Sequence, residues 1–214
     1  WWRAESWESS VGYSFFTTYN NDLPSFNVMD HMGSAGLTYK TALGAMPMQA
    51  GLQYSFDQLY LDQKPFIERH TLTLSDTLVE NDLNLTQLFT RYQHKDFSGA
   101  RPRGDRRENR DADNIMLGFL HLLRFAEDRH FVKAGYQFDY EDAIGTNYAY
   151  FGHRLSTGGQ YTLPWGAVRL KYDFDVHLRD YMHKNSILPT PNPGSKRRQD
   201  EEITNIARVE YPIP

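Results

Sequence analysis

A ladder of ionisable residues between positions 169 and 179 is the part of the sequence best suited to polar chemistry. Every second residue there carries a titratable group: Arg169, Lys171, Asp173, Asp175, His177 and Arg179. The residues between them, from Leu170 to Leu178, are all apolar or aromatic. In a membrane channel, rings of charge select one class of solute. In a narrow closed interior, the same side chains would instead pair with one another and fill the space.

Polar residues of other segments extend this set. Segments that we expect to lie beside the ladder in a sheet carry the same alternation and add Lys133, Asp139, Glu141, Arg154, Arg208 and Glu210. Together these twelve residues are our predicted lining of an enclosed polar interior. The sequence leaves two interpretations open, a selectivity lining for a polar solute or an internal salt-bridge network.

Catalytic and metal-binding motifs are absent from the sequence. It contains no Gly-x-Ser-x-Gly, no His-Glu-x-x-His and no phosphate-binding loop. It has no cysteine, which excludes disulfides and thiolate metal ligands. A rim-sited enzyme would have to use His94 with Asp96, or His183. We therefore predict no enzyme, no catalytic residue, no metal site and no cofactor.

The elements that position the predicted lining are β-strands. Between Val168 and Arg179, apolar and charged residues alternate six times without an error. A period of two is the pattern of a strand with two different faces, and a helix would scatter the charges all round. Similar alternation, in places weaker, recurs over residues 10–19, 36–44, 52–60, 70–80, 83–94, 115–125, 132–141, 154–163 and 208–211. We predict ten strands in a single domain over residues 1–214.

The predicted connections between strands alternate in length. Short ones fall at 46–49, 81–82, 127–129 and 164–166, and longer ones at 20–34, 62–68, 97–112, 142–150 and 184–202. This rhythm predicts an antiparallel up-and-down meander in which every second connection lies at the same end of the sheet.

Strand length and connection rhythm favour a transmembrane β-barrel. Strands of globular proteins mostly have five or six residues, whereas a tilted membrane-spanning strand needs about 9–11. Backbone polar groups must all be paired in a bilayer, so a sheet has to close into a barrel there. Tyrosines near predicted strand ends suit the aromatic girdles of such barrels: Tyr13, Tyr19, Tyr60, Tyr140, Tyr161, Tyr172 and Tyr211.

The same alternation also fits a soluble β-sandwich or a lipocalin-like barrel with the two faces exchanged. In the membrane interpretation Leu170, Tyr172 and Phe174 contact lipid, and Lys171 and Asp173 are enclosed. In the soluble interpretation the rings form the core and the charges contact water.

Composition narrows the classes of partner. The chain has 23 Lys and Arg against 27 Asp and Glu, a formal net charge of −4, which gives no argument for nucleic-acid binding. The most apolar run, from Ile115 to Leu123, is too short for a membrane-spanning helix. The sequence starts at Trp1 without an export signal and ends on Pro-Ile-Pro, so we expect a mature or trimmed segment of a longer protein.

Two stretches carry a family resemblance. One is Glu108–Asn114 leading into Ile115–Gly118, and the other extends from Tyr150–Arg154 through Tyr161–Trp165 to Tyr172–His177. They resemble the C-terminal barrel of bacterial outer-membrane proteins that carry periplasmic tetratricopeptide repeats. The resemblance implies a barrel of ten or more strands in the outer membrane of a Gram-negative bacterium, and porin-like transport or export of a polar solute or polymer. It also implies a periplasmic repeat domain or another subunit as partner.

The alternative function is a structural membrane anchor with a filled lumen, which would hold a periplasmic or surface partner without transport. In either case we expect contact with membrane lipids and lipopolysaccharide. Arginine forks suit lipopolysaccharide phosphates, and the connection at 97–112 supplies Arg101, Arg103, Arg106, Arg107 and Arg110. A solvated loop explains the same residues equally simply.

Overall fold

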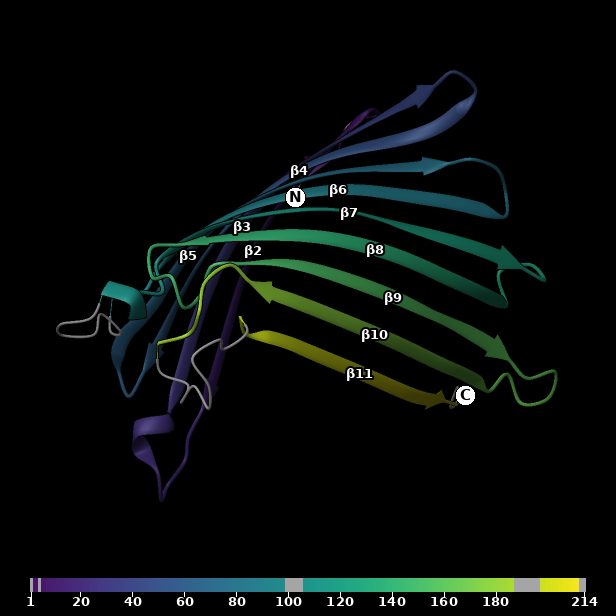
Figure 1. Ribbon diagram of the computed structural model, residues 1–214. Coiled ribbons are helices and arrows are strands. Elements are labelled where there is room, and N and C mark those ends of the chain that lie inside the picture. Colours follow the sequence, from purple (N-terminus) through teal and green to yellow (C-terminus); the bar gives the residue numbers. More distant parts are fainter. Residues whose placement is uncertain (1, 4, 99–105, 187–196, 212–214) are drawn as a thin grey trace.

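The fold is one antiparallel sheet in which the order of strands in space is their order in sequence (Figure 1). The computed structural model describes residues 2–3, 5–98, 106–186 and 197–211. A two-residue strand precedes ten long ones: β1 (Trp2–Arg3), β2 (Trp7–Thr18), β3 (Val28–Leu43), β4 (Met46–Leu61), β5 (Lys64–Val79), β6 (Asn84–Asp96), β7 (Ala112–Phe125), β8 (His130–Ala143), β9 (Tyr150–Thr162), β10 (Arg169–Tyr181) and β11 (Gln199–Glu210).

Helical structure in the described residues is confined to two 3₁₀ turns, η1 (Pro24–Phe26) and η2 (Arg106–Glu108). No described helix has the length and apolarity needed to cross a membrane. The ten long strands and their up-and-down order confirm the predicted all-β class. The sheet is open rather than a closed barrel, because in the described residues β11 pairs with β10 alone, and β2 pairs with β3 and briefly with β1.

One predicted long connection is wrong. Residues 62–68 do not form a loop, because Asp62 and Gln63 alone connect β4 to β5. Both adopt positive φ values, 51° and 61°, as the two central residues of a type I′ hairpin turn require. Aspartate tolerates this left-handed conformation better than most residues, so the chain reverses at once and β5 begins at Lys64.

Other predicted boundaries also shift. The turn placed at 46–49 lies at residues 44–45, where Gly44 has a φ of 63°, so β4 begins at Met46. The turn placed at 164–166 extends over residues 163–168, between β9 and β10. Long connections remain at 19–27, 97–111 and 182–198, all at the same end of the sheet (Figure 1). We call this end the long-connection end and the opposite one the short-turn end.

The sheet curves strongly, and its two faces differ in chemistry. In Figure 1 it arches from β2 on one side to β11 on the other. Large apolar side chains on one face are solvent-exposed, among them Tyr13 at 69% and Tyr172 at 50%. Several buried side chains on the other face are polar, among them Asn114 at 1% and Asp139 at 7%. Burial marks the polar face as the concave one, because curvature crowds side chains together on that side.

Candidate functional site

The predicted ladder lies on β10, with its charged side chains on the concave face. Residues 171, 173, 175, 177 and 179 are partly buried, whereas the alternate residues Leu170, Tyr172 and Leu178 are exposed on the convex face. The period of two therefore separates charges from rings, as the sequence predicts. Side chains from neighbouring strands decide what the charges do.

Ten of the twelve predicted lining residues take part in an ion pair, and the other two, His177 and Asp139, lie within hydrogen-bond distance of each other. Within 4.0 Å the structure pairs Asp173 with Lys133 and Arg208, Asp175 with Arg154, His177 with Asp139, Arg179 with Glu202, Glu210 with Lys171 and Arg169, and Glu141 with Lys95. The shortest contacts lie near 2.7 Å, a distance typical of charge-assisted hydrogen bonds. On β8 to β11, the charged side chains of the concave face are thus paired with one another or, for Glu141, with Lys95 on β6.

Three of these pairs bridge strands that are not neighbours, two between β8 and β10 and one, described below, between β6 and β8. Lys133 on β8 reaches Asp173 on β10 at 2.7 Å, and His177 on β10 reaches Asp139 on β8 at 3.2 Å. Such strands are separated by about 9.6 Å, two strand spacings. Side chains can meet across that gap only where the sheet is concave and the strand between them leaves room.

Glycines of the intervening strand β9 provide that room. A Cβ added to Gly158 would lie 2.6 Å from Asp173 Oδ1 and 2.8 Å from Lys133 Cε. A Cβ added to Gly152 would lie 2.0 Å from Asp139 Oδ1 and 2.9 Å from His177 Nε2. Both positions therefore need glycine, and we call them the glycine saddles.

The third pair that skips a strand, between β6 and β8, joins Glu141 of the predicted lining to a residue outside it. Lys95 Nζ lies 2.7 Å from Glu141 Oε1, and the side chains are only 18% and 9% exposed. Small Ala112 on β7 lies opposite Lys95 in register. The alternation of β6 contains Lys95, but only strand order shows that it faces Glu141.

A cavity of about 500 Å³ opens on the concave face between β6 and β11. Its polar lining combines ion-paired charges with amides and hydroxyls, and its apolar lining includes the Phe89 ring and Ile206. The ring of Phe89 packs over Gly118, where an added Cβ would lie 2.6 Å from it. This cavity is large enough for a small polar molecule.

Connections at the long-connection end are linked to one another. Asn147, which is 2% exposed, donates a hydrogen bond from Nδ2 to Ser186 Oγ at 2.7 Å and accepts one at Oδ1 from the Ser186 backbone N–H. Its Nδ2 also contacts Glu108, whose other carboxylate oxygen accepts a hydrogen bond from Tyr148. Segments 106–111, 144–149 and 182–186 thus form one packed unit at this rim.

The arginines expected to contact lipopolysaccharide divide into two groups. Arg101 and Arg103 lie outside the described residues. Arg106 and Arg107 lie in η2, and the Arg110 guanidinium lies 5.0 Å from the centre of the Tyr148 ring. Elsewhere at this rim, a hydrogen bond to Asp200 raises the pKa of Arg198.

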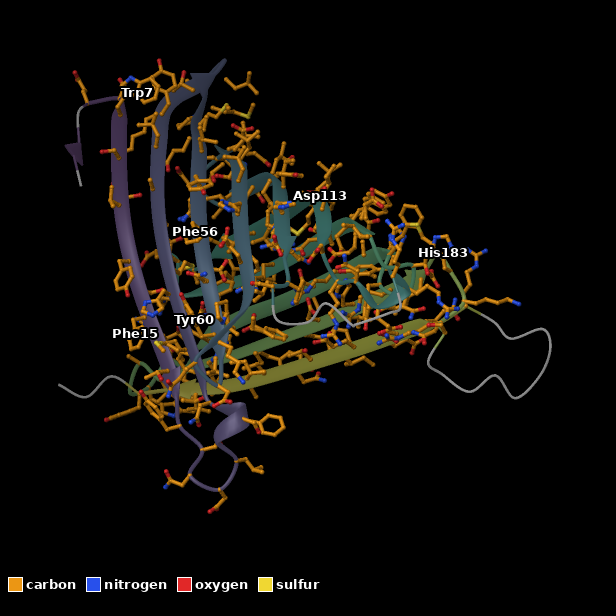
Figure 2. All side chains as sticks on the ribbon, turned by 90° about the vertical axis from the view of Figure 1, so that its left-hand side faces the viewer. Trp7, Phe15, Phe56, Tyr60, Asp113 and His183 are labelled. Carbon is orange, nitrogen blue, oxygen red and sulfur yellow. The ribbon has the colours of Figure 1, made fainter. Side chains whose placement is uncertain are left out.

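The histidines considered for an enzyme lie apart. His94 Nδ1 lies 2.9 Å from Asp113, which also accepts a hydrogen bond from Tyr92 at 2.6 Å. His183 follows β10 at another part of the rim (Figure 2). Over the described part of the chain, no three His, Asp or Glu side chains gather as a metal site would require.

A repeated tyrosine unit on the convex face escaped the sequence analysis. In each unit a tyrosine hydroxyl hydrogen bonds to a polar side chain on the next strand at 2.6–2.7 Å, and the five pairs are Tyr13–His31, Tyr54–His70, Tyr92–Asp113, Tyr136–His153 and Tyr172–Asn205. The signal was present as Tyr-x-Phe, or Tyr-x-His at Tyr92, on every second strand. We call these five pairs the tyrosine belt.

The predicted girdle differs from this belt. Of its seven tyrosines, Tyr13 and Tyr172 belong to the belt, and Tyr60 hydrogen bonds within β4 to Gln58 at 2.9 Å. Tyr161 stacks on His130 near the short-turn end, with ring centres 4.4 Å apart.

Comparisons of this chain with protein-family models, with curated protein sequences and with solved structures gave no match.

Proposed function

We propose that this sheet is the wall of a transmembrane β-barrel in a bacterial outer membrane, and that it acts as a structural anchor with a filled, charge-neutral interior. The observation that carries the proposal is the opposition of the two faces: exposed rings and aliphatic side chains outside, paired charges inside. A soluble sandwich or lipocalin-like barrel would bury the ring-bearing face. Leu170 and Tyr172 are instead 40% and 50% exposed.

The slope of the tyrosine belt supports a tilted membrane wall. Following the paired residues across the sheet, we compare the positions of the five tyrosines along the strand direction. Tyr54 lies two residues closer to the short-turn end than Tyr13, and Tyr92 is level with Tyr54. Tyr136 lies four residues closer to that end than Tyr92, and Tyr172 lies four residues closer than Tyr136. Given a rise of about 3.3 Å per residue and a strand spacing of about 4.8 Å, this line crosses the strands at a slope of about 40°. Strands of membrane barrels tilt by about 35–45° from the barrel axis. The belt would therefore lie level in a membrane.

Carboxylates on the convex face support the same orientation. Five lie on the long-connection side of the belt, and a sixth, Asp113, belongs to the belt itself; the five are Glu68, Asp96, Asp142, Asp180 and Glu201. In the described strands this face carries no Lys or Arg between them and the short-turn end, and Asp76 is its one further carboxylate. A band free of most charge next to a charged rim is what a lipid-facing wall requires.

The concave face favours an anchor over a selective pore. A selectivity ring needs charges that are free to bind a solute, whereas each of the twelve predicted lining residues already contacts a partner, ten of them in ion pairs. Three of the pairs span three strands and so connect parts of the sheet that do not share backbone hydrogen bonds. Such an anchor would hold a periplasmic repeat domain or a surface partner in place.

The membrane proposal is tested by placing one tryptophan on either face. In a background whose native tryptophans are replaced by phenylalanine, Leu117→Trp puts a reporter on the convex face and Met116→Trp puts one on the concave face. Phospholipids with brominated acyl chains should quench the fluorescence of the tryptophan at position 117 and leave that of the tryptophan at position 116 unchanged. Equal quenching of the two, or quenching of neither, would refute the proposal.

A pore or export channel, the function expected first from the sequence, remains the second candidate. The 500 Å³ polar cavity is the observation that favours it. Conductance across planar bilayers separates the candidates, since an anchor with a filled interior passes no steady current. Steady single-channel currents would favour the pore.

A further inference from the structure

The two outermost long strands leave backbone hydrogen-bonding groups unpaired. Strand β11 pairs along one side with β10, and β2 pairs with β3. On its other side β2 is covered at Glu8 and Ser9, by β1. From Ser10 to Thr18 this side pairs with no described strand. An exposed edge of this length invites pairing, and in a bilayer unpaired edges are not tolerated.

The unpaired groups of the two edges belong to residues on the same face. In an antiparallel sheet, the backbone groups of successive residues point to opposite neighbours. Lys40 N donates to Ser6 O, so the backbone groups of concave-face residues of β2 form hydrogen bonds with β3. The backbone groups of its convex-face residues therefore point away from β3, to the free edge. Tyr181 N donates to Arg198 O, so convex-face residues of β11 also point outwards. The two edges therefore match in hydrogen-bonding phase.

The tyrosine belt predicts the register in which the edges would meet. From Tyr13 on β2 to Tyr172 on β10, the belt moves ten residues towards the short-turn end in eight strand-to-strand steps, as set out above. Around a barrel of ten strands this corresponds to a shift of about twelve residues. A level belt must return to its own height after one turn of a barrel. Ten of these twelve residues are reached at Tyr172, whose partner on β11 is Ala207. The remaining two lead from Ala207 to Val209, so this condition places Tyr13 opposite Val209.

Side chains fit in that register. Phe16 and Ile206, two apolar residues on the concave face, would lie directly opposite each other. They are 58% and 39% exposed in the open sheet, and pairing would cover both. Tyr211 would lie opposite Val11, directly beyond the two residues that β1 covers, so β1 and β11 would share the edge of β2 without overlap.

We infer that β2 and β11 of one chain pair with each other, Tyr13 opposite Val209, and close the sheet into a ten-stranded barrel. The occupant of each edge is thus the other edge of the same molecule, not a second copy. A shift of about twelve residues around ten strands gives a strand tilt of about 40°. This inference rests on the proposed function, because a sheet in a bilayer cannot leave these edges unpaired.

Disulfide mapping tests the register directly, since the chain has no cysteine. Phe16→Cys with Ile206→Cys places the two thiols on a non-hydrogen-bonded pair, for which the Cα separation is about 4.5 Å. That separation lies within the range of about 4.4–6.8 Å that disulfides span. Phe16→Cys with Thr204→Cys is the matched control, on the same face but two residues out of register.

In the membrane-reconstituted full chain, mild oxidation should link the first pair within one molecule and leave the control largely reduced. The linked monomer is recognised by its altered mobility without reductant. A disulfide between two molecules would overturn the inference in favour of a second copy. Equal linkage of the control would overturn the register. No linkage, with the Leu117→Trp reporter still quenched by brominated lipid, would overturn closure while leaving the membrane proposal intact.

Discussion

Replacing Gly152 by alanine tests whether the glycine saddles make room for the polar contacts across β9. The added Cβ would lie 2.0 Å from Asp139 Oδ1 and 2.7 Å from its Cγ, distances at which the Asp139 carboxylate must move. Its contact with His177, on the strand beyond, would then be lost. The two side chains are only 10% and 17% exposed, so water replaces this contact poorly.

The expected cost follows from two opposing contributions. Losing a hydrogen bond to a charged group costs about 1.5–3 kcal/mol. Replacing glycine by alanine inside a strand returns about 0.5–1 kcal/mol of backbone entropy. We expect Gly152→Ala to lower the free energy of unfolding by about 1–2 kcal/mol. Gly33→Ala is the matched control, because nothing lies within 4 Å of the Cβ it would add, and it should be neutral or slightly stabilising.

Urea unfolding in lipid vesicles, followed by tryptophan fluorescence, measures both changes. A second comparison isolates the cause: in an Asp139→Ala background the carboxylate is gone, so adding Gly152→Ala should cost little. The reasoning is refuted if Gly152→Ala is as stable as the parent. It is equally refuted if the substitution costs the same with and without Asp139.

Three further substitutions follow from the packing. Tyr136→Phe removes the hydroxyl that lies 2.7 Å from His153, and should lower the free energy of unfolding by about 0.5–1.5 kcal/mol in the same urea assay. Gly118→Ala forces its Cβ against the Phe89 ring and to 2.9 Å from the Tyr136 backbone carbonyl oxygen, and should cost about 1–3 kcal/mol; Phe89→Leu in the same chain relieves the first contact alone, so it should recover part of the loss in thermal unfolding. Lys95→Met leaves the buried carboxylate of Glu141 unpaired and should cost about 3 kcal/mol or more, whereas adding Glu141→Gln should restore stability. An unchanged midpoint for Lys95→Met would contradict the buried pairing.

Much of the fold was readable from local patterns. Alternation over residues 168–179 predicted a strand with charges on one face, and β10 has that form. The ten strands and their antiparallel order followed from the same periodicity. The connection at 62–68 was misread, because Lys64 and Pro65 look like loop residues, while the left-handed conformation of Asp62 and Gln63 reverses the chain in two residues.

The candidate site was only partly readable. The twelve predicted residues include many of the charges that meet on the concave face, but not Lys95, the partner of Glu141, nor Glu202, the partner of Arg179. The glycine saddles at 152 and 158 looked like ordinary small residues of a strand. Their role appears only when β8 and β10 are placed on either side of β9, which no local pattern specifies.

The sequence by itself determined which side chains share a face, because the period of two is a local property of an extended backbone. Tertiary structure alone decided which charges pair, which tyrosines align into a belt and which face is concave. These depend on strand register and sheet curvature, which arise from contacts between residues distant in the chain. Tyr13 and Tyr172 therefore fall on one line only once the registers of all the strands between them are known.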